Sequence, residues 1–253
     1  ILDQNGKLVR HYSDKEETGF ISFPGGPPAD PVLPKKSGLN RFVWDMRYPT
    51  LPGVPTVFIE GAYEGRKSAP GNYSARIKYN SSEKIVPFKI LPDPRITSTA
   101  TDYEEQQQWV TKAEEGIKDI HESVLRIRKI RKQVTEVTEL VDTTKMKEIW
   151  DSGKKLADKL LKWEEELVQN KAQSNDDIIN FINKTSADYI FLKGEMDANI
   201  PYVTSGQKQQ YEKLNAGWQK LKADMNALLD KDVAGFNRLC KEKNLEKIIV
   251  PAK

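Results

Sequence analysis

The sequence predicts a multidomain β + α protein, with an antiparallel β-sandwich over residues 1–95 followed by an antiparallel, up-down four-helix bundle over residues 96–253. Two observations support this prediction. Twelve of the 14 prolines lie in the first segment, whereas residues 96–200 contain none. Because proline lacks a backbone donor and breaks helix interiors, long helices are expected only after residue 95. Apolar residues also alternate in the first segment and recur every three or four residues in the second.

Short alternating segments separated by turn signals predict the sandwich. Asn5-Gly6 is typical of a two-residue hairpin turn, and a second hairpin is expected around Asn80-Ser81-Ser82. Pro87 must then lie on an edge strand or at a bulge. Five or six such strands with one aromatic face each indicate two packed sheets of immunoglobulin-like or fibronectin-like type. The expected strands are 1–9 as a hairpin, 38–48, 57–59, 73–79 and 84–91.

Two proline-rich segments, 13–36 and 49–56, interrupt the expected strands. Loops longer than about 12–15 residues are usually functional or disordered. Two interpretations remain open for these segments. They are either surface insertions or loops that pack on a neighbouring domain.

Apolar seams at heptad-like spacing predict four amphipathic helices in the second segment. The connections between them are short, so neighbouring helices are expected to run antiparallel. Residues on the seams are interpreted as core, and the fourth seam continues from Leu228 through Val233, Phe236 and Leu239. The expected helices are 101–141, 146–167, 176–196 and 205–239.

Few residue types suited to catalysis or metal binding are present. The chain has one cysteine, Cys240, and two histidines, His11 and His121. It contains no Glu-x-x-His pair, no phosphate-binding glycine loop and no Gly-x-Ser-x-Gly elbow. Glycoside hydrolysis needs only two carboxylates, but Glu164–Glu166 is interpreted as a solvated face. We therefore assign no catalytic, cofactor-binding or metal-ligating residue, and we expect no cofactor.

The charge balance argues against a nucleic-acid partner. Forty basic and 37 acidic residues give a net charge of +3. The densest basic run, 126–132, lacks interleaved aromatic residues and is interpreted as a solvated face that pairs with acids. No run of 18 or more apolar residues occurs, so no membrane span is expected.

Three segments carry a family resemblance: Ile1–Arg10, Gly38–Arg47 and Ala69–Arg76. Their order resembles the immunoglobulin-like sandwich of flagellar hook-capping proteins. Together with Pro92–Arg95 and the long helices that follow, they resemble the C-terminal region of secreted bacterial proteins with sortilin-type β-propellers. These BNR-repeat proteins are often labelled glycosyl hydrolases.

The resemblance implies an extracytoplasmic bacterial setting, which is secreted, periplasmic or at the cell surface. The propeller's Asp-box, Ser-x-Asp-x-Gly-x-Thr-Trp, is absent from this sequence. The chain is therefore expected to be a fragment and to act as a non-catalytic C-terminal structural or interaction module. Its expected partner is the missing propeller or another surface protein, and a carbohydrate ligand is left open.

Two alternatives remain. Segments 13–37 and 49–70 could line a carbohydrate-active site at the junction with the propeller, whose own residues would then carry most of the catalysis. The helices could instead serve as an oligomerisation device. Whether the parent protein is an enzyme is left open.

Overall fold

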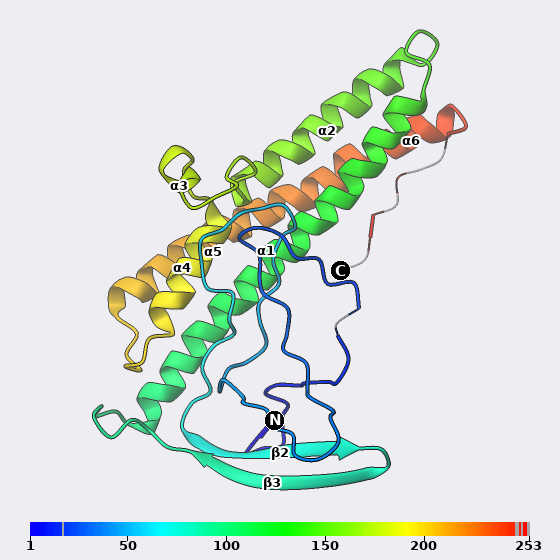
Figure 1. Ribbon diagram of the computed structural model, residues 1–253. Coiled ribbons are helices and arrows are strands. Elements are labelled where there is room, and N and C mark those ends of the chain that lie inside the picture. Colours follow the sequence, from blue (N-terminus) through cyan, green and yellow to red (C-terminus); the bar gives the residue numbers. More distant parts are fainter. Residues whose placement is uncertain (17, 246–247, 249, 252–253) are drawn as a thin grey trace.

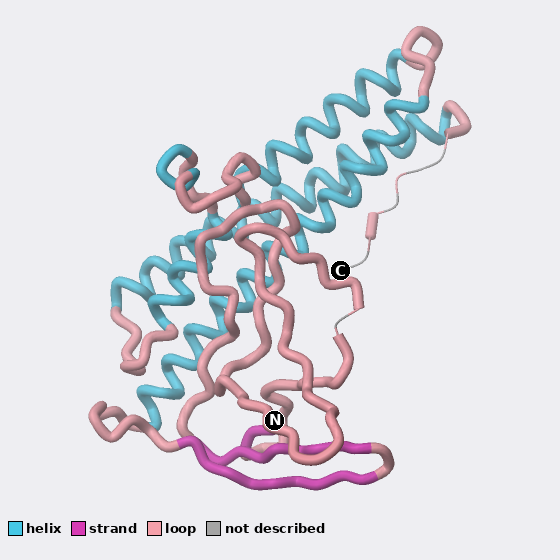
Figure 2. Tube along the Cα trace, in the orientation of Figure 1, coloured by secondary structure: helices cyan, strands magenta, loops and turns pink. Residues whose placement is uncertain are grey.

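The computed structural model describes residues 1–16, 18–245, 248 and 250–251. Long helices form one side of the molecule, and most of the first 70 residues run beside them as loops (Figures 1 and 2). A small sheet lies at one end of these loops. The elements are β1 (Leu2–Asp3), β2 (Gly71–Tyr79), β3 (Ser82–Ile90), α1 (Ala100–Leu140), α2 (Lys147–Leu167), α3 (Asp177–Asn180), α4 (Thr185–Met196), α5 (Ser205–Ala227), the π-helix η1 (Leu228–Val233) and α6 (Ala234–Glu242).

The predicted β-sandwich is wrong. The described residues contain one three-stranded antiparallel sheet, in the order β1-β2-β3. Segments 38–48 and 57–59 are irregular, apart from a single bridge between Arg47 and Lys67. Val57 is fully buried, but its side chain belongs to the same core as the helices. The loops therefore pack on helices, where the sequence had predicted a second sheet.

The hairpin β2–β3 is confirmed, and so is the edge position of Pro87. Tyr73 lies opposite Phe88, and Ser74 lies opposite Pro87. Because β3 is the outer strand, the missing N–H of Pro87 is tolerated there. The alternation predicted along 73–79 is also confirmed, because Tyr73, Ala75, Ile77 and Tyr79 lie on one face of the sheet.

The long first helix is confirmed as α1, which spans 41 residues. It begins one residue after Thr99, which forms a capping box with Asp102. The predicted seam is buried along its length. The seam residues are Val110, Ala113, Ile117, Ile120, Val124 and Ile127.

The predicted four-helix bundle is wrong, because its third helix is broken. The segment expected to be one helix over 176–196 contains the single turn α3 and the 12-residue α4. Ile182, predicted to be core, is exposed between them, and the side chain of Ile178 lies outside the described residues. α2 and α4 follow each other along α1 (Figure 1), so the helices form three columns.

Loop residues cover these three columns where a fourth helix had been expected. Their buried side chains join the helical core. The residues are Leu51, Val54, Val57, Ile59 and Tyr63. The proposed boundary between two domains near residue 95 stays a prediction, but this core includes side chains from both sides of it.

The third column contains η1, a π-helical turn between α5 and α6. The predicted seam includes Leu228, but Leu228 is half-buried and its neighbour Leu229 is buried instead. A π turn holds more residues than an α turn, so it absorbs one extra residue without moving the seam. Buried side chains continue through it at Met225, Leu229 and Val233.

Gly153 allows α2 to approach α1 closely. A Cβ at this position would lie 3.1 Å from the Cβ of Thr138 and closer still to its hydroxyl. We expect Gly153→Ala to lower the free energy of unfolding by about 1–2 kcal/mol, because overpacking outweighs the gain in helix propensity. Gly217→Ala, where a Cβ meets nothing within 4 Å, is the control. It should raise the free energy of unfolding by up to ~1 kcal/mol in denaturant titrations. Equal effects of the two changes would contradict the close approach.

Candidate functional site

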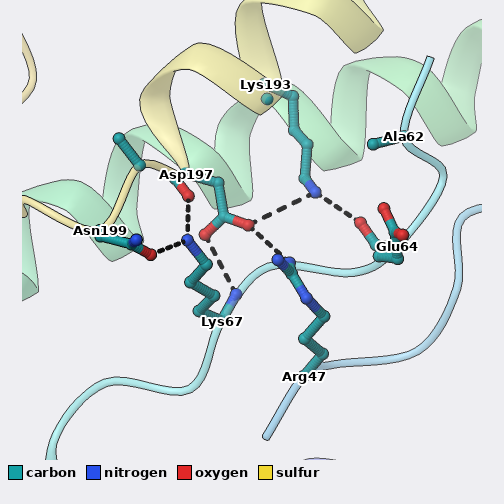
Figure 3. Close-up of a pocket in the computed structure, with 9 residues that line it drawn as sticks. Arg47, Ala62, Glu64, Lys67, Lys193, Asp197 and Asn199 are labelled. Atoms are coloured by element: carbon teal, nitrogen blue, oxygen red, sulfur yellow. Dashed lines mark hydrogen bonds and ion pairs between the residues drawn. The ribbon is translucent and has the colours of Figure 1, made fainter. Parts of the chain in front are cut away.

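The candidate site is a pocket of about 300 Å³ at the end of α4, where three cationic side chains surround Asp197 (Figure 3). Arg47 Nη1 lies 2.9 Å from Asp197 Oδ2, and Lys193 Nζ lies 3.6 Å from the same oxygen. The backbone N–H of Lys67 donates to Asp197 Oδ1 at 3.1 Å. Asp197 is buried, so this carboxylate neutralises part of an otherwise positive cluster.

The end of α4 brings these groups together. Lys193 and Asp197 are one turn apart, and the last carbonyls of a helix have no partner within it. The Lys67 ammonium donates to the carbonyl of Asp197 at 2.9 Å and to Asn199 Oδ1 at 2.6 Å. The amide of Gln106, on α1, donates to the carbonyls of Met196 and Ala198. The helix end is thus completed by side chains from elsewhere in the chain.

Burial sets the electrostatics of the pocket. Desolvation lowers the pKa of Lys193 from its ordinary value, and the nearby Asp197 carboxylate opposes this shift. The pKa of Lys67 is lowered for the same reason. Lys193 also donates to the backbone carbonyl of Glu64 at 2.5 Å. These side chains suit contact with an anionic group, and the partners described above are acceptors of the same chain.

A second buried pair lies next to the pocket and involves α1. Both the backbone N–H and the guanidinium Nη1 of Arg66 donate to the Glu114 carboxylate, each at 2.6 Å. The Arg66 guanidinium also lies 3.5 Å above the ring centre of Tyr48. Gln107 donates to the carbonyl of Lys67 at 2.9 Å. Segment 47–67 is therefore attached to α1 as well as to α4.

His121 and Ser186 form a pair that resembles a base and its nucleophile. His121 Nε2 lies 2.5 Å from Ser186 Oγ, and Nδ1 lies 2.6 Å from the carbonyl of Pro52. Burial lowers the pKa of His121 to about 4, so the ring is neutral near pH 7. The Pro52 carbonyl can only accept, so Nδ1–H donates to it and Nε2 accepts from the hydroxyl. Both side chains are fully buried, and neither lines the pocket at α4.

No sequence pattern points to this pair, because 65 residues separate its members. His11, the other histidine, is exposed, and Cys240 is a buried free thiol. Within the described part of the chain, no three His, Cys, Asp or Glu side chains form a group suited to a metal ion. No helix there is long and apolar enough to cross a bilayer.

The interpretation of Glu164 as part of a solvated face is wrong. Its carboxylate is fully buried and accepts from Arg128 at 2.7 Å and from Arg131 at 3.1 Å. Two members of the supposedly solvated basic run therefore point into the interface between α1 and α2. The spacing of Leu160, Glu164 and Leu167 carries the signal, because steps of four and three place Glu164 on the apolar seam.

The chain matches no protein-family model, and neither the curated proteins nor the solved structures contain a match. The resemblance to propeller-associated C-terminal regions therefore stays a prediction.

The buried neutral His121 predicts a specific dependence of stability on pH. Its pKa is about 4 in the folded chain and ~6.5 once it is exposed by unfolding. Only the unfolded state gains this proton between pH 6.5 and pH 4. The His121 contribution to stability is therefore complete above pH 6.5, and ~3 kcal/mol is lost as the pH falls to 4.

Denaturant titrations across this pH range check the prediction. His121→Gln should remove the part of the pH dependence of the free energy of unfolding that His121 contributes, whatever its effect on stability at pH 7. His11→Gln changes the exposed histidine and should leave the slope as it is. Identical slopes for the native chain and His121→Gln would show that the buried ring is not held neutral.

Three consecutive glutamates offer a second matched comparison. Glu164→Gln leaves the Arg128 and Arg131 charges without their buried carboxylate and should lower the free energy of unfolding by about 3 kcal/mol or more. Glu165→Gln alters an exposed neighbour and should change it by no more than ~0.5 kcal/mol. Chemical denaturation at pH 7 measures both values. A small loss for Glu164→Gln would contradict its role between the helices.

Proposed function

We propose that the chain is a non-catalytic structural and interaction module of a larger secreted or cell-surface bacterial protein with a sortilin-type β-propeller. The observation that supports an interaction role is the uncovered apolar face of the hairpin β2–β3. The choice of a propeller as the partner, and of an extracytoplasmic location, comes from the sequence resemblance.

The apolar face is covered at only one end. Trp44 packs against the rings of Tyr73 and Phe88, with centroids 6.1 and 6.0 Å away. Toward the turn, Tyr79 is 74% exposed, Ile77 55% and Val86 39%. The strand register places these three on the same side as Tyr73 and Phe88. Lys84 and Ser82 lie on this face as well, opposite Ile77 and Tyr79. Exposed apolar side chains grouped with polar neighbours are typical of a docking site.

The hairpin is also presented by a fixed support. It lies at the end of the loop layer, with β3 outermost (Figure 1). The buried pairs at Glu114 and Asp197 attach that layer to α1 and α4. A docking face needs such a support, because an ordered surface loses less conformational entropy on binding.

The proposal predicts that the reading frame upstream of Ile1 encodes propeller repeats with the Asp-box. The propeller produced from that region should bind this chain in isothermal titration calorimetry. Ile77→Ser combined with Tyr79→Ser should weaken the affinity by roughly tenfold or more, because both side chains lose apolar contacts.

Ile179→Ser is the control, because Ile179 is an exposed apolar residue, 85% exposed, that lies on α3. It should leave the affinity unchanged. An upstream region without propeller repeats would overturn the choice of partner. Equal affinities for the double variant and the native chain would overturn the role of the hairpin face.

A further inference from the structure

We propose that the pocket at the end of α4 binds the carboxylate of a small organic acid, with Arg47 and Lys67 as the groups that contact it. None of the described residues that line this pocket belongs to β2 or β3. The inference therefore goes beyond the docking function of the hairpin and does not depend on it.

The first supporting observation is that one buried carboxylate serves three cations, which surround it in Figure 3. Asp197 Oδ2 lies 2.9 Å from Arg47 Nη1 and 3.6 Å from Lys193 Nζ. Among the described residues, the Lys67 ammonium donates only to neutral acceptors, the carbonyl of Asp197 and the side-chain oxygen of Asn199. Lys193 is almost fully buried, so water screens its charge little. The cluster therefore attracts a further anion.

The second observation is that N–H donors of these cations are left over. A guanidinium carries five N–H groups, and Arg47 donates from Nη1 to the carbonyl of Gly65 and to Asp197, both at 2.9 Å. Its Nε–H and Nη2–H have no acceptor within the described part of the chain. Two parallel donors of this kind form the fork that binds both oxygens of a carboxylate. The Lys67 ammonium has three N–H groups and two described acceptors.

The third observation is a space that no side chain fills. The pocket has a volume of about 300 Å³, which is at the small end for ligand sites. Gly194 lines it from the last turn of α4, and a Cβ at this position would meet nothing within 4 Å. Glycine is unfavourable inside a helix, and close packing does not require it here. Its missing side chain instead leaves the pocket open.

Charge and shape favour a carboxylate over a phosphate. Three cations and two carboxylates, those of Asp197 and Glu64, line the pocket, so one positive charge remains. A carboxylate carries one negative charge and two oxygens in one plane, which fits both this charge and the fork of Arg47. A phosphate dianion would bring a second negative charge close to the two acids. The small volume limits the ligand to a small acid.

The test titrates the full chain with glycolate, a two-carbon hydroxy acid, at constant ionic strength and follows the backbone amide shifts by NMR. We expect saturable shifts at Gly65, Lys67 and Gly194, with a dissociation constant on the order of 1 mM. Glycolamide has nearly the same shape without the charge and should bind roughly tenfold more weakly or worse. The site is overturned if glycolate does not saturate these shifts or if glycolamide binds equally well. Tighter binding of inorganic phosphate would overturn the choice of a carboxylate.

A variant that fills the pocket keeps every charged group. Gly194→Leu should weaken glycolate binding roughly tenfold or more, because the new side chain occupies the space of the ligand. Gly217→Leu places the same side chain on α5, where a Cβ also meets nothing within 4 Å, and should leave the affinity unchanged. Both changes replace a helical glycine by a better helix former, so both variants should fold. Equal affinities of the two variants would show that glycolate binds elsewhere.

Charge variants identify the contacting groups. Arg47→Lys keeps a positive charge beside Asp197 but removes the fork, and Lys67→Gln removes the ammonium. Each should weaken glycolate binding roughly tenfold. Glu64→Gln removes an acid that repels the ligand and should tighten binding roughly twofold. Lys220→Gln removes an exposed charge on α5 and is the control. Native affinity in both Arg47→Lys and Lys67→Gln would overturn the assignment of these two residues.

Discussion

The structure depends on side chains of the helices that satisfy the backbone of an irregular segment. Residues 47–67 form no regular sheet ladder. Some of their backbone groups bond to one another, as Tyr48 does to Arg66 and Leu51 to Tyr63, and other buried groups need partners elsewhere. His121 and Arg128 of α1 donate to the carbonyls of Pro52 and Pro55, and Lys193 of α4 donates to that of Glu64. These bonds give three loop carbonyls a partner where apolar loop residues enter the helical core.

This use of the loops explains why the hairpin is left uncovered. In a sandwich, the segments around residues 44 and 57 would form a second sheet over the apolar face of β2 and β3. Here Val57 packs into the helical core, and Trp44 packs against Tyr73 and Phe88. The same side chains cannot fill both positions. Because the loop residues pack on the helices, they do not cover the hairpin, and its apolar face stays exposed.

Local features of the fold could be predicted from the sequence, and long-range partners could not. The hairpin, the extent of α1 and the edge position of Pro87 follow from periodicity and from the missing proline donor. Periodicity does not say which surface an alternating segment packs against. It therefore predicts strands at 38–48 and 57–59, although these segments pack as irregular loops. Among the polar contacts described above, Glu164 on its seam and the i,i+4 pair Lys193–Asp197 have a local signal. Asp197 and Arg47 are 150 residues apart, and no spacing pattern joins them.

The π-helical turn makes one column of the molecule tolerant to a change of chain length. Each residue removed from an α-helix rotates everything beyond it by about 100° around the axis. In the middle of α1, such a deletion would turn the following seam residues toward solvent. Within Leu228–Val233, the loss of one residue converts the wide turn to ordinary α-helix and leaves Phe236 and Cys240 facing inward. Single-codon deletions are therefore neutral for core orientation at this point in the gene.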